Sequence, residues 1–348
     1  MDDFFIEFHD PLFSIIVFFL LIFVVTFFSY WWGRYRYQKS SQDLDNFLKG
    51  LNSHESEDEL PILIQNGELS QKSWLLLAES YFKSGDYEKS IDIYNELLKL
   101  SDVSSSKEIM FLLGKTYFKA GFLERSKQMF LEILKNYPKT PEALKFLLLV
   151  YENLRDYRSA LETLEPLEEL QKDIAKDSVY LKLLAIINTR EKRKDLQIAS
   201  LLEIYKQNNY LTHMVFEFLF QTDIEIAWKN IDILKSELLI DIFWHIDEKN
   251  LDFDIISKSD FLKELYTARG DIDAVSKSSI FEFDVLINLK KSSNATLNFD
   301  YVCSSCQYNH PFAFNRCSRC HNIDTQIVEF SLAKNYFRNF NEENNSFQ

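Results

Sequence analysis

The hydrophobic and polar positions divide the chain into an apolar start, an acidic stretch and a long body of alternating groups. Residues 12–32, LFSIIVFFLLIFVVTFFSYWW, carry no charge, whereas residues 40–60 hold six Asp or Glu against one Lys. From residue 71 to residue 295, apolar groups alternate with polar ones in the manner of successive helix pairs. We therefore expect an all-α body preceded by a membrane-spanning helix.

The composition supports helices over strands. The 348 residues include 31 Phe and 17 Tyr but only 7 Gly and 6 Pro, and so few helix breakers favour long helices joined by short turns. The net charge of −14 argues against a general affinity for nucleic acid phosphates. An acidic surface is more simply explained by solubility or by contact with basic partners.

Residues 12–32 match a transmembrane helix. At a rise of about 1.5 Å per residue, these 21 residues cover a hydrocarbon layer of about 30 Å. Tyr30, Trp31 and Trp32 stand at one end, where aromatic rings suit the headgroup region. The alternative is a cleaved signal peptide, but the stretch is long for one, no small-residue cleavage site follows it, and the residues before it are acidic.

The positive charges beside the span predict its direction. Arg34, Arg36 and Lys39 follow the span and no Lys or Arg precedes it, so residues 1–11 are expected outside the cell membrane. Residues 33–70 would then form a cytoplasmic linker. We expect a single-pass protein of the inner membrane, with most of the chain facing the cytosol.

A repeat follows the linker. Tyr81, Tyr117 and Tyr151 are 36 and 34 residues apart, and each stands in a similar context: an apolar pair, the Tyr, a turn, a small residue and a large apolar residue. The small residues are Ser90, Ser126 and Ala160, and the large ones are Tyr94, Phe130 and Leu164. Small residues let two helices approach closely, while each unit needs neighbours to bury its apolar face. The alternative is a helical bundle whose Tyr spacing is accidental.

These segments resemble the tetratricopeptide repeat (TPR), whose signature is Trp, Leu-Gly, Tyr, Gly at the turn, Ala, Phe, Ala and Pro. The matching positions are Trp74, Leu77, Tyr81 and Gly85 in the first unit and Leu113, Gly114, Tyr117, Gly121, Phe130 and Pro138 in the second. The resemblance implies a TPR-type α-solenoid with clear repeats over residues 71–170. Over residues 171–295 the signature fades, although Tyr266 keeps its offset from Gly270, and we expect a degenerate continuation of the solenoid.

All four cysteines of the chain lie close together near its end. Their spacing is Cys303-x2-Cys306-x10-Cys317-x2-Cys320. Two Cys-x-x-Cys turns supply the tetrahedral thiolate set that Zn²⁺ prefers, and with no open coordination position the site would be structural. Such a metal would hold a small zinc ribbon at residues 299–330, whose own core is too small to fold alone, and would leave residues 331–348 as a tail.

Other uses of the four thiols stay open. The main one is iron binding as in rubredoxin, although turns of that type carry Gly where this chain has Gln307 and His321. A redox-active thiol pair is another, whereas a nucleic-acid-binding ribbon is disfavoured because the region has few basic residues. His310 and His321 could replace a thiolate, but with four well-spaced Cys we expect them beside the site or exposed.

The ribbon is rich in aromatic residues, more than so small a module can bury. These residues are Phe299, Tyr301, Tyr308, Phe312 and Phe314. We expect some of them to dock the ribbon against the solenoid.

No sequence signature of catalysis stands out. The seven Gly are too far apart for a phosphate-binding loop, and no metalloprotease, serine hydrolase or kinase motif is present. We therefore expect no enzymatic activity, no small-molecule substrate and no nucleic acid partner.

The order of span, TPR solenoid and ribbon resembles the lipopolysaccharide assembly protein B (LapB) family. Specific matches are WWGRYRYQKS after the span and FDYVCSSCQYNHPFAFNRCSRC around the cysteines. The resemblance implies a cytosol-facing adaptor that limits lipopolysaccharide synthesis by promoting degradation of LpxC by the membrane protease FtsH. It also implies Zn or Fe ligation by the four cysteines and a rubredoxin-like ribbon packed back on the repeats. The chain departs from the family in its acidic linker, in the faded repeat signature after residue 170 and in its extra tail. The identity of the client protein therefore stays open.

The leading hypothesis is an adaptor whose concave repeat face binds another protein, expected to be a membrane protease or an envelope-lipid enzyme. The positions that usually line such a face are Glu79, Phe82, Lys115, Phe118 and Glu152. The rivals are a membrane-tethered, rubredoxin-like iron redox module and a general scaffold for assembling membrane complexes.

Overall fold

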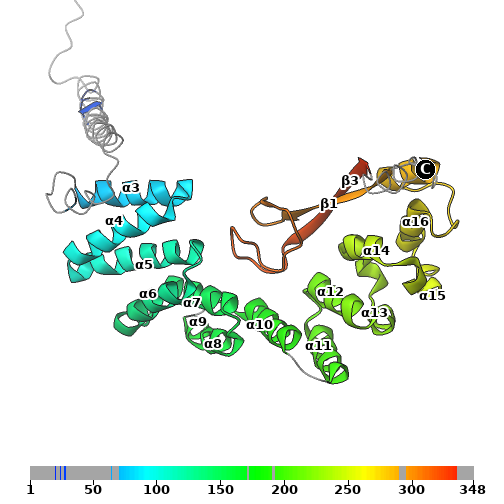
Figure 1. Cartoon of the computed structure of the whole chain (residues 1–348), viewed down its shortest axis with the longest axis horizontal. Helices are drawn as coiled ribbons and strands as arrows, with labels where there is room; N and C mark the ends of the chain where they lie inside the picture. The colour runs from blue at the N-terminus through cyan, green and yellow to red at the C-terminus, as the bar shows by residue number, and fades with distance from the viewer. Residues whose placement is uncertain are drawn as a thin grey trace, which may run out of the picture. The chain divides into compact units, whose positions relative to one another are not determined.

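The computed structural model describes residues 70–170, 172–189, 193–289 and 295–334, together with residues 20, 24, 27, 28 and 64. These residues belong to two compact units, Met1–Val150 and Tyr151–Gln348. Figure 1 labels most of the elements of both units.

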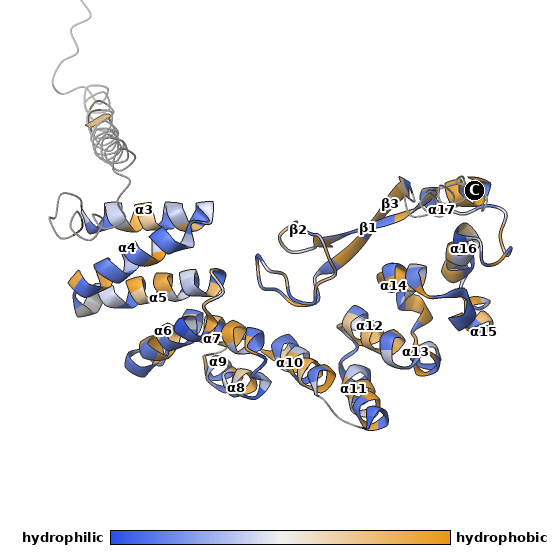
Figure 2. Cartoon of the chain, viewed as in Figure 1, coloured by the Kyte–Doolittle hydropathy of each residue, from blue (hydrophilic) through white to orange (hydrophobic). Residues whose placement is uncertain are grey.

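Consecutive α-helices make up the main described part of the first unit. They are α3 (Gln71–Ser84), α4 (Tyr87–Leu100), α5 (Val103–Lys119), α6 (Leu123–Asn136) and α7 (Pro141–Asn153), whose last residues belong to the second unit. Helix α4 packs against α3 and α5, and α5 packs against α6. Figure 2 shows that each of these helices carries both hydrophobic and hydrophilic residues. In α6 the buried residues Ser126, Phe130 and Ile133 are three or four positions apart and therefore lie on one face.

The junction of α3 and α4 shows how the sequence sets the helix ends. Ser70 accepts a hydrogen bond from the Ser73 N–H at the start of α3, and Gly85 ends the helix in the left-handed conformation, with φ of 88°. Asp86 follows directly and accepts a hydrogen bond from the Lys89 N–H to begin α4. Gly121 takes the same conformation after α5, with φ of 83°. The turn glycines of the repeat thus stand where the backbone requires them.

The packing between α5 and α6 depends on two small residues. Ser126 is fully buried and its hydroxyl donates a hydrogen bond to the Gly114 carbonyl, at 2.8 Å. A Cβ at position 114 would lie 3.0 Å from the Cε1 and Cζ atoms of Phe130, which is itself fully buried. The predicted small positions Ser90 and Ala160 are also fully buried. The small residues that the sequence pattern singles out are therefore buried in the packed interior.

Apart from α10 and α11, the helices of the second unit are shorter than those of the first. They are α8 (Tyr157–Glu162), α9 (Leu164–Glu169), α10 (Ala175–Asn188), α11 (Lys194–Asn208), α12 (Thr212–Thr222), α13 (Ile224–Asn230), α14 (Ile240–His245), α15 (Phe253–Ile256), α16 (Asp260–Arg269) and α17 (Phe281–Leu289), with the 3₁₀ helices η2 (Ile233–Leu239) and η3 (Glu248–Asn250). Side chains of Asp223, Asp232, Asp252 and Ser259 cap the starts of α13, η2, α15 and α16. Each of these caps marks the start of a new helix.

One feature of the repeats survives in this half. Tyr266 is fully buried, and its carbonyl accepts the N–H of Gly270, which ends α16 with φ of 88°. The predicted correspondence between the Tyr266–Gly270 and Tyr81–Gly85 pairs is therefore seen in the backbone.

A three-stranded antiparallel sheet follows the helices. Its strands are β1 (Ala295–Cys303), β2 (Asn309–His310) and β3 (Gln326–Lys334), in the order β2-β1-β3. The register of β1 and β3 runs from Ala295 opposite Lys334 to Cys303 opposite Gln326. The sheet thus starts four residues before the ribbon expected at 299–330 and includes the first residues of the expected tail. Leu297 explains this extension, because it is buried in the same hydrophobic core as the helices.

Among the described residues, no helix combines the length and the apolar character that crossing a bilayer requires. The expected span at 12–32 lies outside the described residues except for Leu20, Val24, Phe27 and Phe28. Residues 1–11 also lie outside them, as do the expected linker at 33–70 except for Ile64 and Ser70, and the tail beyond Lys334.

We expect Gly114→Ala to destabilise the first unit. The added methyl group would press on the Phe130 ring, and overpacking of a core typically costs about 1–3 kcal/mol. Urea unfolding followed by helical circular dichroism measures this loss. In a Phe130→Leu background, which lacks the contacting ring atoms, the same change should cost less than half as much; an equal cost in both backgrounds would contradict the direct contact.

Candidate metal centre and its contacts with the helices

Two turns of the same design carry the four cysteines. In the first, the Gln307 N–H donates to the Cys303 carbonyl at 2.8 Å and the Cys303 N–H donates to the Tyr308 carbonyl at 3.0 Å. In the second, the His321 N–H donates to the Cys317 carbonyl at 2.9 Å, and the Cys317 N–H donates to the Asn322 carbonyl at 2.9 Å. The two turns therefore present their thiols with the same backbone geometry.

The residue after each second cysteine is left-handed. Gln307 has φ of 55° and His321 has φ of 62°. Glycine is the usual residue in this conformation, because side chains crowd the backbone there. Gln307 and His321 thus take the conformation that Gly supplies in rubredoxin-type turns, although neither is Gly.

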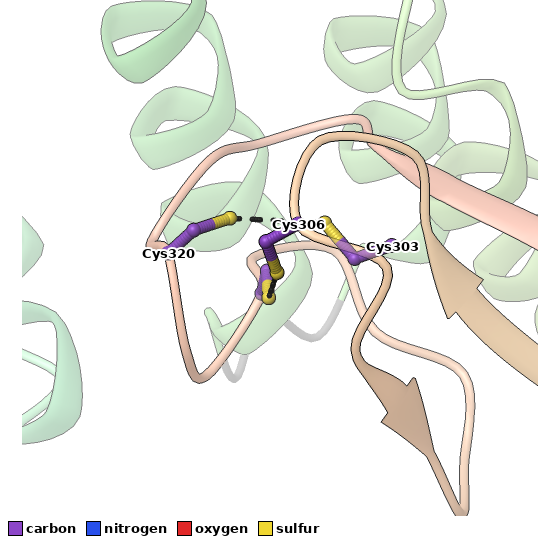
Figure 3. Close-up of side chains that lie close together, drawn as sticks. Cys303, Cys306 and Cys320 are labelled. Carbon is purple, nitrogen blue, oxygen red and sulfur yellow. Dashed lines mark hydrogen bonds between the residues drawn. The ribbon is translucent and has the colours of Figure 1, made fainter.

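The four sulfur atoms converge on one point. All lie within 4.8 Å of one another, and the Cys303–Cys320 and Cys306–Cys317 pairs are each 3.7 Å apart. Figure 3 shows the labelled Cys303, Cys306 and Cys320 side chains drawn together from the two turns. A disulfide needs about 2.05 Å, so these are free thiols placed as a ligand set.

The spacing fits a tetrahedral metal ion. With Zn–S bonds of about 2.3 Å, the edge of a regular tetrahedron of sulfurs is about 3.8 Å, close to the two pairs of 3.7 Å. Four thiolates leave no position for water or substrate, so a bound ion would have a structural role. The same donor set suits iron, and the geometry does not choose between the two metals.

The thiols need a positive charge in order to ionise together. Burial opposes ionisation of Cys303, but hydrogen bonds from the Thr325 hydroxyl and from the N–H groups of Cys306 and Ser305 outweigh it and lower its pKa to about 6. Burial raises the pKa of Cys306 and raises that of Cys320 to about 12. The Cys303 thiolate is favoured even without a cation, whereas ionisation of all four thiols requires a bound cation.

The two histidines lie beside the cysteines. His310 is buried, with Nε2 3.4 Å from the Cys317 sulfur and its ring against that of Phe314. His321 contributes its backbone: its carbonyl accepts a hydrogen bond from Nη1 of Arg316, at 3.0 Å. Neither belongs to the four-sulfur cluster.

Arg316 connects the second cysteine turn to the helices. Its Nε donates to Glu152 at 2.8 Å, its Nη2 donates to Asp177 at 2.9 Å, and its guanidinium lies 5.0 Å from the centre of the Tyr180 ring. The Tyr180 hydroxyl donates to the other oxygen of Glu152, at 3.0 Å. Burial raises the pKa of Glu152, and the charge of Arg316 opposes that shift. The ribbon thus supplies the cation that a buried carboxylate on α7 needs.

Asp241 forms a second polar contact. It is buried on α14, accepts hydrogen bonds from His213 Nε2 at 2.9 Å and from the Tyr301 hydroxyl at 3.0 Å, and so joins α12, α14 and β1. Burial opposes its ionisation, but these hydrogen bonds hold the pKa of Asp241 below its usual range. The Leu211 N–H donates to Asp324 nearby on the ribbon side, at 3.2 Å.

Two of the five ribbon aromatics dock on the helices as expected. Phe299 packs against His245, and Tyr301 reaches Asp241. Tyr308 and Phe314 instead pack on His310 within the ribbon, and Phe312 is 78% exposed. A further contact comes from Phe330, which stacks on Phe283 of α17 with ring centres 5.6 Å apart.

The residues expected to line a partner-binding face divide into two groups. Glu79 forms an exposed ion pair with Lys83, and Phe82, Lys115 and Phe118 are half-buried on α3 and α5. Glu152 does not belong with them: Arg316 covers it, and its side chain is only 12% exposed. It holds the ribbon and is not open to a partner protein.

The sequence reading missed Arg316, Asp177, Tyr180 and the His213–Asp241 pair. Arg316 and Glu152 are 164 residues apart. Charged residues are abundant in this chain, and no local pattern marks the two that meet. The position of Arg316 directly before a metal-ligand candidate was the one available signal.

Comparisons with known proteins identify the repeats. Two tetratricopeptide repeat family models match residues 71–103 and 111–170, which confirms the predicted TPR segment. No curated protein matches the chain. Among solved structures, the crystal structure of BtubC (BKLC) from P. vanneervenii is 17% identical, covers 70% of this chain and 94% of its own, and has a TM-score of 0.27. That score is too low to support an inference from the likeness.

We expect the purified chain to hold one metal ion, and Cys303→Ser to lose it. Replacing one thiolate leaves an incomplete tetrahedral set, so bound metal should fall at least about tenfold. Elemental analysis of protein made without added metal measures both content and identity. Zinc gives a colourless protein and iron a red one; Ser318→Ala, on an exposed position in the same turn, should leave the metal content unchanged. Equal metal in the wild type and Cys303→Ser would contradict the site.

Arg316→Gln should loosen the ribbon. Removing one partner of a buried ion pair typically costs about 3–5 kcal/mol, because the carboxylate stays buried without its cation. Thermal unfolding measures the loss, and faster hydrogen exchange in β1 and β3 would locate it. Because burial already raises the pKa of Glu152, the deficit should shrink as the pH falls and Glu152 takes up a proton.

The matched control is Arg319→Gln, an exposed arginine in the same turn. Glu152→Gln should partly rescue Arg316→Gln, since it removes the uncompensated charge. Equal stability of the two arginine variants would show that the Arg316 contact does not hold the ribbon.

Proposed function

We propose that this chain is a non-enzymatic adaptor that binds other proteins through its TPR repeats. The adaptor is anchored in the inner membrane by residues 12–32 and faces the cytosol. It limits lipopolysaccharide synthesis by presenting LpxC to the protease FtsH. The ribbon carries Zn²⁺ on Cys303, Cys306, Cys317 and Cys320, and the metal has a structural role.

The observation that carries the adaptor proposal is the pair of TPR matches at residues 71–103 and 111–170. TPR helices stack into extended surfaces that bind proteins. Their packing residues, such as Gly114 and Phe130, are buried in the described helices. This supports a surface for protein partners.

The membrane and lipopolysaccharide parts of the proposal rest on the sequence. The uncharged stretch at 12–32, followed by Arg34 and Arg36, supports an anchor with a cytosolic body. The order of anchor, repeats and four-cysteine ribbon resembles the LapB family, which supports the lipid-regulating role. The contact of Arg316 with Glu152 is in keeping with a ribbon packed on the repeats.

A second candidate is a rubredoxin-like iron module for electron transfer. The left-handed conformations of Gln307 and His321 are compatible with it, because they give both turns the backbone form that such centres use. The metal analysis above separates the candidates, since only iron would give visible thiolate-to-metal absorption.

Deleting the gene should raise the level of LpxC and the lipopolysaccharide content several-fold, because LpxC would no longer reach FtsH. Immunoblotting and lipopolysaccharide assay measure the two quantities. The wild-type gene should restore both, whereas Cys303→Ser should not, and crosslinking in membranes should capture the protease or the enzyme with the wild type only.

Unchanged LpxC and lipopolysaccharide levels after deletion would overturn the regulatory role. Capture of other membrane proteins in that case would favour a general scaffold. Labelling of intact cells that places residues 74–320 outside the cytosol would overturn the proposal as a whole.

A further inference from the structure

The first unit carries an aromatic surface with a lysine at its centre. We call it the Lys115 face and define it as Phe82 on α3, Phe111, Lys115 and Phe118 on α5, and Phe146 on α7; all five are half-buried. The first helices of successive TPR hairpins therefore all contribute to it. Three of its members, Phe82, Lys115 and Phe118, are positions that usually line the partner-binding face of TPR proteins.

The ammonium group of Lys115 contacts rings and not carboxylates. It lies 5.9 Å from the centre of the Phe82 ring, 5.8 Å from that of Phe111 and 5.7 Å from that of Phe146. Within the described part of the chain, no ion pair involves Lys115. Ring faces attract a cation, but they are weak acceptors for its three N–H donors. The charge of Lys115 is thus positioned but not neutralised by these contacts.

The rings around Lys115 brace one another. Phe146 lies edge-on to Phe111 at 5.5 Å and to Phe118 at 6.1 Å, and it stacks on Phe130 at 5.6 Å. Phe130 is fully buried against Gly114, so the surface rests on the core of the repeat. A surface held in this way needs little rearrangement before it can bind a ligand.

We propose that the Lys115 face binds an extended segment of a partner protein in which one carboxylate stands next to an aromatic or long aliphatic side chain. The proposal rests on the adaptor function and specifies the chemistry of the client segment. The carboxylate completes the hydrogen bonding of Lys115 in a partly desolvated place, and the apolar side chain covers the surrounding rings. Because the chain has a net charge of −14, a segment with many acidic residues is repelled and a single carboxylate is favoured.

The test is selection of random heptapeptides on phage against the full chain. The wild type should enrich peptides that place Asp or Glu beside Phe, Leu or Ile. A synthetic peptide from the strongest clone should bind Lys115→Met at least about tenfold more weakly, because Met keeps the aliphatic stem and loses the charge. The same peptide with its carboxylate replaced by an amide should lose as much affinity for the wild type and none for Lys115→Met.

The matched control is Lys145→Met, which removes an exposed lysine next to Phe146 on α7 and should change the affinity less than twofold. Unchanged helical circular dichroism would show that both variants are folded. Enriched peptides without an acidic residue, or equal binding by wild type and Lys115→Met, would overturn the proposal.

Two further outcomes separate the possible explanations. The wild type could select no peptide, while a variant without the acidic residues 40–60 selects some. In that case the occupant of the Lys115 face is the chain's own linker, and the partner proposal is overturned. If membrane crosslinking captures a client equally well with wild type and Lys115→Met, the adaptor function stands and the Lys115 face is not its binding surface. Failure to capture any client with either protein would instead count against the adaptor function.

Discussion

Burial of the Glu152 carboxylate is the constraint on which the second unit depends. A charge removed from water is costly unless a cation and hydrogen bonds replace the water, and here both come from elsewhere in the chain. Arg316 supplies the cation, at 2.8 Å, and Tyr180 supplies a hydroxyl, at 3.0 Å. The same guanidinium also donates to the His321 carbonyl in the second cysteine turn, at 3.0 Å. The metal site and the helix surface are therefore linked through one guanidinium group.

The link also explains why a ribbon with so small a core is stable on these helices. Leu297 of β1 belongs to the same core as the short helices of the second unit, and Phe330 of β3 stacks on Phe283. Asp241 adds a polar contact, since it accepts hydrogen bonds from a helix histidine and from a ribbon tyrosine. The four-cysteine cluster, the charge pair and the apolar packing thus each involve a different part of the ribbon.

The features that the sequence predicted correctly are those encoded by neighbouring residues. Gly85 and Gly121 take the left-handed conformation at the predicted repeat turns, and the Cys-x-x-Cys pairs place their thiols through local turns. The features that it missed depend on contacts between residues far apart in the sequence or on an unusual backbone conformation. Glu152 appeared to be a groove position because its helix register is right for one, and only the fold shows that Arg316 covers it. Likewise, a left-handed Gln307 cannot be read from a residue type that usually avoids this conformation.

Arg316 and Lys115 show two different uses of positive charge in an acidic chain. The guanidinium of Arg316 is matched by Glu152 and Asp177, so its charge is neutralised within the second unit and serves the fold. The ammonium of Lys115 faces three rings in the first unit, which hold it without cancelling its charge. Stability alone does not require a lysine there, since a methionine would cover the same rings without the cost of partly desolvating a charge. A charge kept in an apolar surface is therefore better explained by recognition than by folding.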